Sequence, residues 1–397
     1  MTQVSNKAGN VSPSSTLSID AKFKAMKAQG IDVVGFGAGE PDFDTPDHIK
    51  QAAIKAINDG FTKYTPAAGT LQLRQAICDK LKRDNSLTYE PSQIVVSNGA
   101  KHSLMNVFMA ICNPGDEVII PAPYWVSYPE MVKLADGVPV VVDCPESNDF
   151  KITAKQFKNA ITPKTKAFVL NSPSNPTGAT YTADELKEIA DVAVENNIYI
   201  VSDEIYECLV YEGKPVSIAS LNDKIKNLTV VVNGMSKAYA MTGWRIGYTA
   251  SNSDIAKVMA NIQSHATSNP NSIAQAAAVA ALEGGNECVD SMRKAFTERR
   301  NYMVERMNKI DGVSCPTPHG AFYVMMNISK LKGKTFYGVK INTSDDFAQV
   351  FLDVAKVAVV PTSGFGNDDY VRWSYATSME NIKEGLDRLE KFLKHEL

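Results

Sequence analysis

The sequence is short of the residues that build disulfide frameworks and metal sites. Its 397 residues include only six cysteines and five histidines. No two cysteines form a Cys-x-x-Cys pair, and no histidine spacing suits a metal ion. We therefore expect reduced thiols, a cytoplasmic protein and no bound metal.

Long apolar runs and an excess of one charge are also absent. No run approaches the roughly 20 apolar residues that a membrane-spanning helix needs, and the polar N-terminus has no apolar signal core. The net charge is −3, and 44% of the residues are hydrophobic against 21% charged. This composition predicts a globular protein of two or three domains, with neither nucleic acid nor a membrane as a partner.

The glycines from Gly35 to Gly39 lack the spacing of a dinucleotide-binding loop. The segment reads Gly-Phe-Gly-Ala-Gly, whereas that fingerprint needs two residues before its last glycine. A nicotinamide enzyme is therefore disfavoured.

Short apolar runs alternate with helical patterns through the middle of the chain. Helices are expected to start after Thr45, Thr70 and Thr182, which are suited to N-caps. Strands are expected at 94–96, 118–120, 138–142, 167–170, 198–201, 228–232 and 246–250. This order predicts an α/β fold with a largely parallel sheet, covered by helices on both faces. Active sites in such sheets lie at the carboxyl ends of the strands.

The pattern changes after Pro270. Two helices, the second over 289–310, precede strands near 321–325, 357–360 and 371–375 and a last helix near 381–395. This indicates a second, smaller α+β domain. Residues 1–16 are expected to form a flexible polar arm, followed by a helix over 17–29 and a strand over 31–36.

The stretch from Asn233 to Gly247 places two cations between two apolar runs that read as buried strands. A buried ammonium ion is costly, so Lys237 is expected to shift its pKa, as a Schiff-base lysine requires. Arg245 can bind a phosphate through its fork of donors. The alternative for an isolated pair of this kind is a surface hairpin with two solvated cations.

The complete stretch resembles the lysine motif of the class I aminotransferases, which are pyridoxal-phosphate (PLP) enzymes of fold type I. The pattern small-x-Ser-Lys, a spacer, then Gly-x-Arg-hydrophobic-Gly fits from Gly234 to Gly247. The resemblance implies that Lys237 binds PLP covalently and that Arg245 holds its phosphate. Many relatives have a serine where this chain has Gly234, so that hydroxyl contact is either missing or supplied by Ser236.

The resemblance spans the chain from Gly39 to Arg372 and implies roles for several isolated candidates. The turn at Gly99 and Ala100 opens a helix, whose free N–H groups favour a phosphate. Asp203 is implied to bond the PLP ring nitrogen and keep it protonated. The remaining candidates are placed around the cofactor phenolic oxygen (Tyr206, Asn175), over the ring (Trp125) and at the substrate carboxylate (Gly39, Trp125, Asn175, Arg372).

The same resemblance implies an assembly and a domain division. Tyr64 looks like the tyrosine that reaches the phosphate of the neighbouring subunit, which predicts a homodimer with shared active sites. We expect a large PLP-binding domain at 46–299. Residues 1–45 and 300–397 are expected to form the small domain with its N-terminal arm.

The predicted activity is transfer of the amino group of aspartate to 2-oxoglutarate by a ping-pong mechanism. One subgroup of aspartate aminotransferases binds the distal carboxylate with a lysine in the position of Lys101, helped by a Ser-Thr pair that matches Ser15 and Thr16. The alternatives are a broader or aromatic/prephenate specificity, or a carbon–sulfur lyase or cyclopropane-forming synthase on the same fold. A regulatory module would carry a DNA-binding domain, for which the short arm leaves no room.

Overall fold

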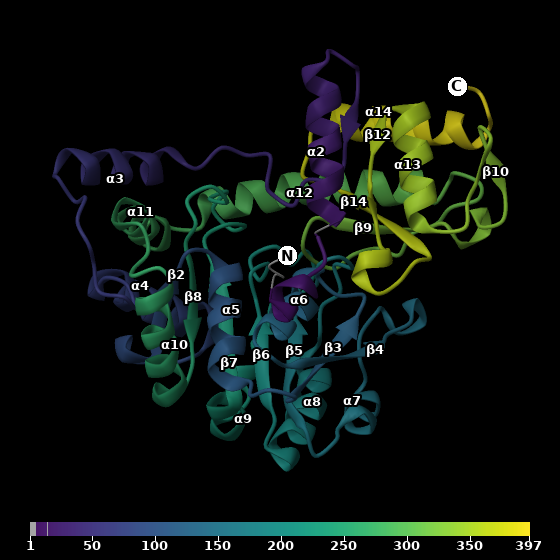
Figure 1. The fold of residues 1–397 in the computed structure, drawn as a ribbon. Coiled ribbons are helices and arrows are strands. Elements are labelled where there is room, and N and C mark those ends of the chain that lie inside the picture. The colour runs from purple at the N-terminus through teal and green to yellow at the C-terminus, as the bar shows by residue number, and fades with distance from the viewer. Residues whose placement is uncertain (1–4, 14) are drawn as a thin grey trace.

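The computed structural model describes residues 5–13 and 15–397. Its centre is a seven-stranded sheet in the order β2-β8-β7-β6-β5-β3-β4 (Figure 1). The strands are β2 (Ile94–Ser97), β3 (Glu117–Ala122), β4 (Val138–Asp143), β5 (Thr165–Asn171), β6 (Tyr199–Asp203), β7 (Thr229–Gly234) and β8 (Gly247–Ala250). Because β8 pairs antiparallel with both of its neighbours, the other six strands point in one direction.

Helices cover both faces of this sheet, as predicted. The alternation of side chains along β2 shows this directly, since Val95 packs with one face and Ile94 and Val96 pack with the other. The first face is covered by α5 (Ala100–Ile111), α6 (Ser127–Leu134) and α10 (Ser253–Ala266). The second is covered by α4 (Leu71–Asn85), α7 (Ala154–Ala160), α8 (Ala183–Asn196), α9 (Asp223–Leu228) and α11 (Ser272–Glu283). The helix α3 (Asp47–Asn58) packs on α11.

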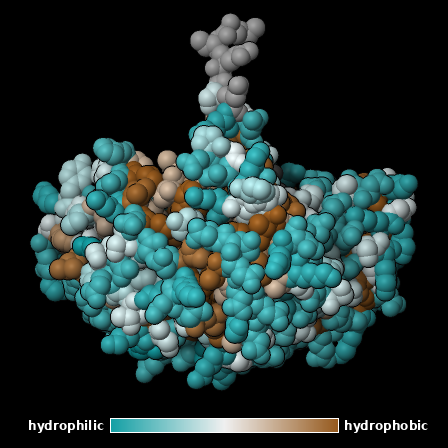
Figure 2. Space-filling view, turned by 90° about the horizontal axis from the view of Figure 1, so that it is seen from below, coloured by the Kyte–Doolittle hydropathy of each residue, from teal (hydrophilic) through white to brown (hydrophobic). Residues whose placement is uncertain are grey.

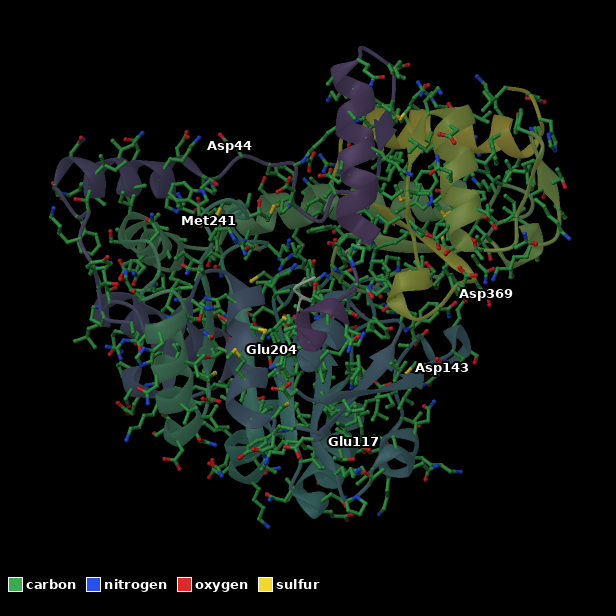
Figure 3. All side chains as sticks on the ribbon, viewed as in Figure 1. Asp44, Glu117, Asp143, Glu204, Met241 and Asp369 are labelled. Atoms are coloured by element: carbon green, nitrogen blue, oxygen red, sulfur yellow. The ribbon has the colours of Figure 1, made fainter. Side chains whose placement is uncertain are left out.

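The common strand direction brings the expected site turns to one edge. Figure 3 shows this direction, with Glu117 at the start of β3 lying low in the view. Asp143 at the end of β4 and Glu204 just after β6 lie higher, toward the second sheet. The turns that follow β2, β6 and β7 therefore share the edge that faces the second sheet.

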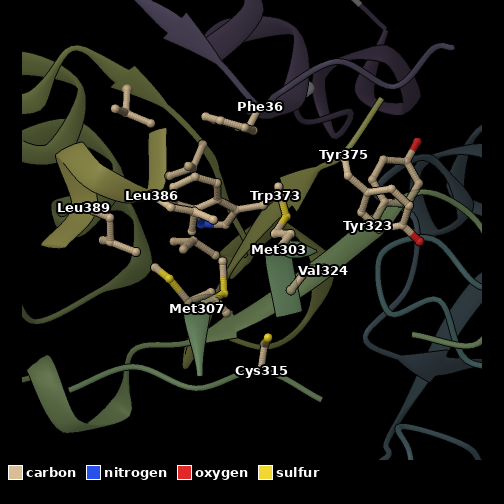
Figure 4. Packing of buried hydrophobic residues seen from close by; sticks show 14 of the residues in the cluster. Phe36, Met303, Met307, Cys315, Tyr323, Val324, Trp373, Tyr375, Leu386 and Leu389 are labelled. Carbon is tan, nitrogen blue, oxygen red and sulfur yellow. The ribbon is translucent and has the colours of Figure 1, made fainter. Parts of the chain in front are cut away.

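The second sheet is antiparallel and has the order β13-β14-β9. Its core packs around Trp373, which contacts Phe36 and Phe351 at ring-centroid distances of 4.5 and 5.9 Å (Figure 4). The helices and strands of the chain after α11 are α12 (Glu287–Met307), β9 (Tyr323–Asn327), β10 (Thr335–Phe336), β11 (Val339–Lys340), α13 (Ser344–Ala355), β12 (Val357–Ala358), β13 (Val360–Pro361), β14 (Tyr370–Ser374) and α14 (Met379–Leu393).

The N-terminal segment packs against these late elements. It contains α1 (Asn6–Gly9), α2 (Ser15–Ala28) and β1 (Val34–Gly35). Val34 pairs in parallel register with Val357 of β12, and α2 contacts β13. The segment also reaches the large sheet, because the N–H of Ser12 donates to Glu130 of α6 at 2.9 Å.

Several local predictions were wrong. Thr45 does not cap α3, because its hydroxyl donates to the Ala240 carbonyl at 2.7 Å and accepts from the Trp244 indole at 3.0 Å. The strand expected over 31–36 is only two residues long, and the one over 357–360 divides into β12 and β13. The helices α6, α7, α9 and α10 were not predicted, although N-caps at Thr153, Asn222 and Asn252 mark the starts of the last three.

The exposed surface agrees with the mixed composition. Seen from below, the molecule is mostly hydrophilic, with smaller groups of apolar residues among the polar ones (Figure 2). Within residues 5–13 and 15–397, none of the helices combines the length and the apolar character needed to cross a membrane.

Candidate active site

A cavity of about 470 Å³ lies at the shared carboxyl edge of the large sheet. We call it the central cavity. Its walls combine the turns after β6 and β7 with α2, α6, the first turns of α5 and the second sheet. Most of the predicted site residues line it, namely Gly39, Ala100, Lys101, Trp125, Asn175, Asp203, Tyr206, Ser236, Lys237, Arg245 and Arg372. The fold therefore brings together residues that are spread over more than 300 positions.

Lys237 lies on the turn that follows β7 and lines the central cavity. Its Nζ donates to the carbonyl oxygen of Gly39. Burial lowers the pKa of Lys237 to about 8, assisted by the nearby cations Arg245 and Arg372 and opposed by Glu40 and Asp203. At pH 7.4 a group with a pKa of about 8 is roughly one-fifth neutral, far more than an ordinary lysine with a pKa of about 10.4. A lysine nucleophile or general base needs this neutral amine.

Asp203 ends β6, and its side chain is buried. Tyr128 of α6 donates its hydroxyl to Oδ2 at 2.7 Å, and the N–H of Ile205 donates to Oδ1 at 3.2 Å. Burial raises the pKa of Asp203 to about 6, because the two hydrogen bonds and Lys237 compensate only part of the lost hydration. A buried carboxylate beside a cavity is suited to pairing with a protonated ring nitrogen.

The N-terminus of α5 forms an anion-binding corner with Arg245. Ala100 and Lys101 belong to the first helical turn, whose N–H groups have no partner within the helix. Gly99 has φ +89, and a Cβ at Gly99 would lie 2.2 Å from Nη2 of Arg245. A Cβ on Gly247 would similarly lie 2.2 Å from the Ala100 nitrogen. The two glycines thus let the arginine and the helix end converge, which suits a phosphate.

Arg372 of β14 reaches the central cavity from the second sheet and is only 1% exposed. It donates from Nη1 to Oδ1 of Asn175 at 2.8 Å and from Nη2 to the Gly37 carbonyl at 3.1 Å. Its buried Nε has no hydrogen-bond partner, and the described residues place no carboxylate within ion-pair distance of it. Burial lowers the pKa of Arg372, and an anionic ligand would relieve that cost.

Aromatic rings complete the walls. The Tyr206 and Tyr323 hydroxyls are 2.9 Å apart, and burial raises the pKa of Tyr206. Trp125 packs edge-on against Tyr128 with centroids 5.3 Å apart. The Nζ of Lys101 lies 4.9 Å from the centre of the Trp125 ring, and burial lowers the pKa of this lysine.

Two of the described predicted residues, Gly99 and Tyr64, do not line the cavity, although Gly99 is the N-cap of α5 and directly precedes the lining residue Ala100. Tyr64 is 90% exposed and lies in the loop before α4. Ser15 and Thr16 begin α2, but their side chains lie outside the described residues.

Sequence reasoning missed other residues that line the cavity, including Asp20, Lys24, Glu40, Tyr128, Asn171 and Tyr323. The short separation of Tyr128 from Trp125, three residues along the chain, is a signal that could have indicated the first of the two tyrosines.

This set of residues fits PLP. The corner formed by Gly99, the start of α5 and Arg245 offers helix N–H groups and an arginine for the phosphate. A Cβ on Gly99 would fill this corner. Lys237 offers an amine for the aldehyde, and Asp203 offers a carboxylate for the ring nitrogen. Within the described residues, no cluster of three or more His, Cys, Asp or Glu side chains could hold a metal ion.

Comparison with known proteins identifies the family. The model for "Aminotransferase class I and II" matches residues 31–389. The aspartate aminotransferase of Bacillus sp. (strain YM-2) is 52% identical, covering 98% of this chain and 99% of that protein. The aspartate aminotransferase structure from Rhizobium meliloti has a TM-score of 0.95 at 45% identity and covers 99% of both chains. That from Thermus thermophilus with maleate has a TM-score of 0.93 at 42% identity, covering 99% of this chain and 100% of that chain. This chain belongs to the class I and II aminotransferases.

Proposed function

We propose that the protein is a PLP-dependent aspartate aminotransferase, which moves the amino group of aspartate to 2-oxoglutarate and yields oxaloacetate and glutamate. Its relatives support this substrate, because the similar proteins described above are aspartate aminotransferases. Four cations on the central cavity, Lys101, Lys237, Arg245 and Arg372, have no ion-pair partner among the described carboxylates. With Lys237 and Arg245 assigned to the cofactor, the observation that carries the proposal is the remaining pair, Arg372 and Lys101. A dicarboxylic substrate supplies one carboxylate for each.

Arg372 is the proposed site for the α-carboxylate. Asn175 and the Gly37 carbonyl fix its guanidinium, and its Nε is still free to donate. Planar arginine donors bind carboxylates with two parallel hydrogen bonds, which orients the substrate as well as holding it. The α-hydrogen would thereby be directed toward Lys237.

Lys237 is proposed to attach the cofactor and then to move the substrate proton. Bound PLP supplies an electron sink for the electron pair left when the Cα–H bond breaks. Once the substrate amine has replaced it, the Lys237 amine can accept the α-proton at Nζ and later return it as a general acid. Asp203 would hold a proton on the ring nitrogen, and Tyr206 and Asn175 would bond the phenolic oxygen. Both substrates occupy the central cavity in turn, so we expect ping-pong kinetics.

Lys101 is the proposed site for the distal carboxylate. Lys24 also lines the cavity but already forms an ion pair with Asp20 at 2.7 Å. Lys101 instead lies over the Trp125 ring, where burial opposes its charge. The Thermus thermophilus structure was solved with maleate, which is itself a dicarboxylate. We also propose that Ser15 and Thr16 contribute hydroxyl groups to this subsite.

Replacement of Lys101 tests the substrate assignment. A hydrogen bond to a charged group is worth about 1.5–3 kcal/mol. Lys101→Ala should therefore lower kcat/KM for aspartate by roughly 10- to 150-fold, while alanine and phenylalanine, which have no distal carboxylate, change little. Steady-state kinetics with each donor and 2-oxoglutarate would measure this.

Lys166→Ala is a matched control. It removes a lysine that lies 5.6 Å from the Tyr199 ring, near the opposite end of the strands, and it should leave all donors unchanged. Equal losses for aspartate and alanine in Lys101→Ala would contradict the dicarboxylate assignment.

The assembly, the domain division and the location are also proposals. A homodimer with shared sites is supported by Tyr64 and by a group of exposed apolar side chains near it in sequence, Ile54, Ile57, Phe61 and Leu71. We propose a large domain at 46–299, with 1–45 and 300–397 forming the small one, supported by the pairing of β1 with β12. A cytoplasmic location is in keeping with the six free thiols.

A further inference from the structure

A buried polar cluster lies outside the central cavity and belongs to none of the roles proposed so far. Lys80 donates from Nζ to Oε1 of Glu207, and the two side chains are only 5% and 7% exposed. Asn85 accepts from Lys80 at 2.6 Å and donates to the other Glu207 oxygen. Asn233 donates from Nδ2 to Oε1 of Glu207 at 2.7 Å. All four residues are buried.

This cluster joins three separate parts of the fold. Lys80 and Asn85 come from α4, Glu207 follows Tyr206 in the turn after β6, and Asn233 is near the end of β7. Backbone groups extend the cluster toward the turn after β6 and toward the lysine turn after β7. The N–H of Glu207 donates to the Glu204 carbonyl at 2.9 Å, and Oδ1 of Asn233 accepts from the Gly234 N–H at 2.7 Å. The cluster therefore links the turn after β6 to the start of the lysine turn.

The stability of the fold does not by itself account for such a pair. Two charges lose their hydration when they are buried, and apolar residues of similar volume are often equally stabilising. A carboxylate that accepts from three fixed donors, however, determines where each donor lies. Apolar packing would leave more freedom between the two turns, and catalytic geometry is sensitive to displacements of about 1 Å.

We propose that Lys80 and Glu207 are positioning residues for the reaction, an inference that rests on the function proposed above. Neither residue lines the central cavity. Together they hold the turn of Lys237 in register with the end of β6, which carries Asp203. The pair thus acts on the proton-transfer geometry and leaves the carboxylate-binding residues in place.

The double variant Lys80→Met with Glu207→Leu tests the proposal in the holoenzyme. We expect kcat with aspartate to fall on the order of 10- to 100-fold, whereas KM changes less because Arg372 and Lys101 are untouched. The absorption band of the bound cofactor should change its pH midpoint by about half a unit or more, because the environment of Lys237 changes. Urea unfolding shows whether stability changes in parallel.

A matched control removes a similar ion pair from the surface. Lys187 and Asp191 of α8 are 2.7 Å apart and more than half exposed, and Lys187→Met with Asp191→Leu should leave kcat and the spectral midpoint unchanged. If the buried double variant does not fold, Lys80→Met with Glu207→Gln removes both charges but keeps a side-chain oxygen that can accept from Asn233, and the same measurements are made on it. A folded variant with parental kcat and spectral midpoint would overturn the proposal. Absence of transamination in the parent enzyme would instead overturn the proposed aminotransferase function. The pH midpoint of the cofactor absorption band would then still show whether the Lys80–Glu207 pair affects Lys237.

Discussion

Burial acts on Lys237 and Asp203 in opposite directions. Loss of hydration disfavours the charged form of each group, so it lowers the pKa of Lys237 to about 8 and raises that of Asp203 to about 6. The mutual attraction of the two side chains opposes both shifts, but burial is the larger effect. Between these values the site therefore holds an ionised carboxylate beside an amine that gives up its proton easily.

The lowered pKa of Lys237 predicts the pH dependence of its reactivity. In the apo-protein, an amine-selective arylating reagent should label Lys237 at a rate that rises through a midpoint of about 8, because only the neutral amine is nucleophilic. Exposed lysines should show midpoints near the ordinary value of about 10.4. Peptide mapping after labelling at several pH values would measure both. A midpoint near 10 for Lys237 would contradict the environment described here.

The raised pKa of Asp203 predicts that this residue destabilises the apo-protein. The folded state binds the carboxyl proton more tightly than the unfolded state, so the stabilising contribution is present below pH 3.8 and is lost as the pH rises through about 6. Asp203→Asn should therefore stabilise the apo-protein at pH 8, by up to roughly 3 kcal/mol at about 1.36 kcal/mol per pKa unit. An asparagine there can still accept from the Ile205 N–H and bond the Tyr128 hydroxyl.

Urea unfolding of parent and variant at pH 4 and pH 8 would check this. The gain should shrink toward pH 4, where the parent carboxyl is largely protonated. The same variant should slow α-proton removal, since it lacks the carboxylate that we propose keeps the ring nitrogen charged. Equal stability at pH 8 would show that the carboxylate is better solvated than its burial indicates.

At the scale of the element, the start of α5 combines a helix N-terminus with Gly99, a position that has no room for a side chain. Gly99 has φ +89, and its missing Cβ leaves room for the Arg245 guanidinium. Arg245 itself has φ +57 and is held by a hydrogen bond from Nη1 to the Thr242 carbonyl at 2.8 Å. The helix end and the lysine turn therefore depend on each other.

Gly99→Ala should displace Arg245 and weaken PLP binding. Loss of a charge-assisted hydrogen bond to the phosphate would raise the Kd for PLP by roughly 10- to 150-fold. Gly115→Ala is the control, because Gly115 has a similar φ of +86 but open space around its missing Cβ. Both variants should lose stability through backbone strain, and only the first should bind PLP more weakly in a titration of the apo-protein. Equal Kd values for the two would contradict the phosphate corner.

At the scale of the whole molecule, the proposed dimer completes each site with a residue from the other subunit. Tyr64 is 90% exposed, which is unusual for a tyrosine beside a cofactor site in the same chain. A partner subunit would cover it. Lys237 and Arg245, by contrast, line the same cavity of one chain.

Mixing two defective chains distinguishes a site residue that comes from the partner subunit from one that belongs to the same chain. Lys237→Ala chains combined with Tyr64→Ala chains should recover about one quarter of the parental activity, since half of the dimers are hybrids and each hybrid has one intact site. Lys237→Ala combined with Arg245→Ala should recover nothing, because both residues belong to one chain's cavity. An active monomer in light scattering at assay concentration would rule out shared sites.

Local sequence patterns predicted several features that depend on neighbours within one or two turns. Thr70 and Thr182 cap α4 and α8 as predicted, and Thr182 forms a reciprocal capping box with Glu185. The helix predicted to open at the turn of Gly99 and Ala100 is present as α5. Thr45 shows the limit of such patterns, because the partner that redirects its hydroxyl is 195 residues away.

The sequence by itself determined the fold class and the family, and it named most of the predicted site residues that line the central cavity. The alternation of strands and helices and the contiguous lysine motif are both written along the chain. Only the tertiary structure decided which side chains meet. Asp203 meets Tyr128 across 75 residues and Arg372 meets Asn175 across 197. The physical reason is that burial and ion pairing depend on spatial neighbours, which a one-dimensional pattern does not specify.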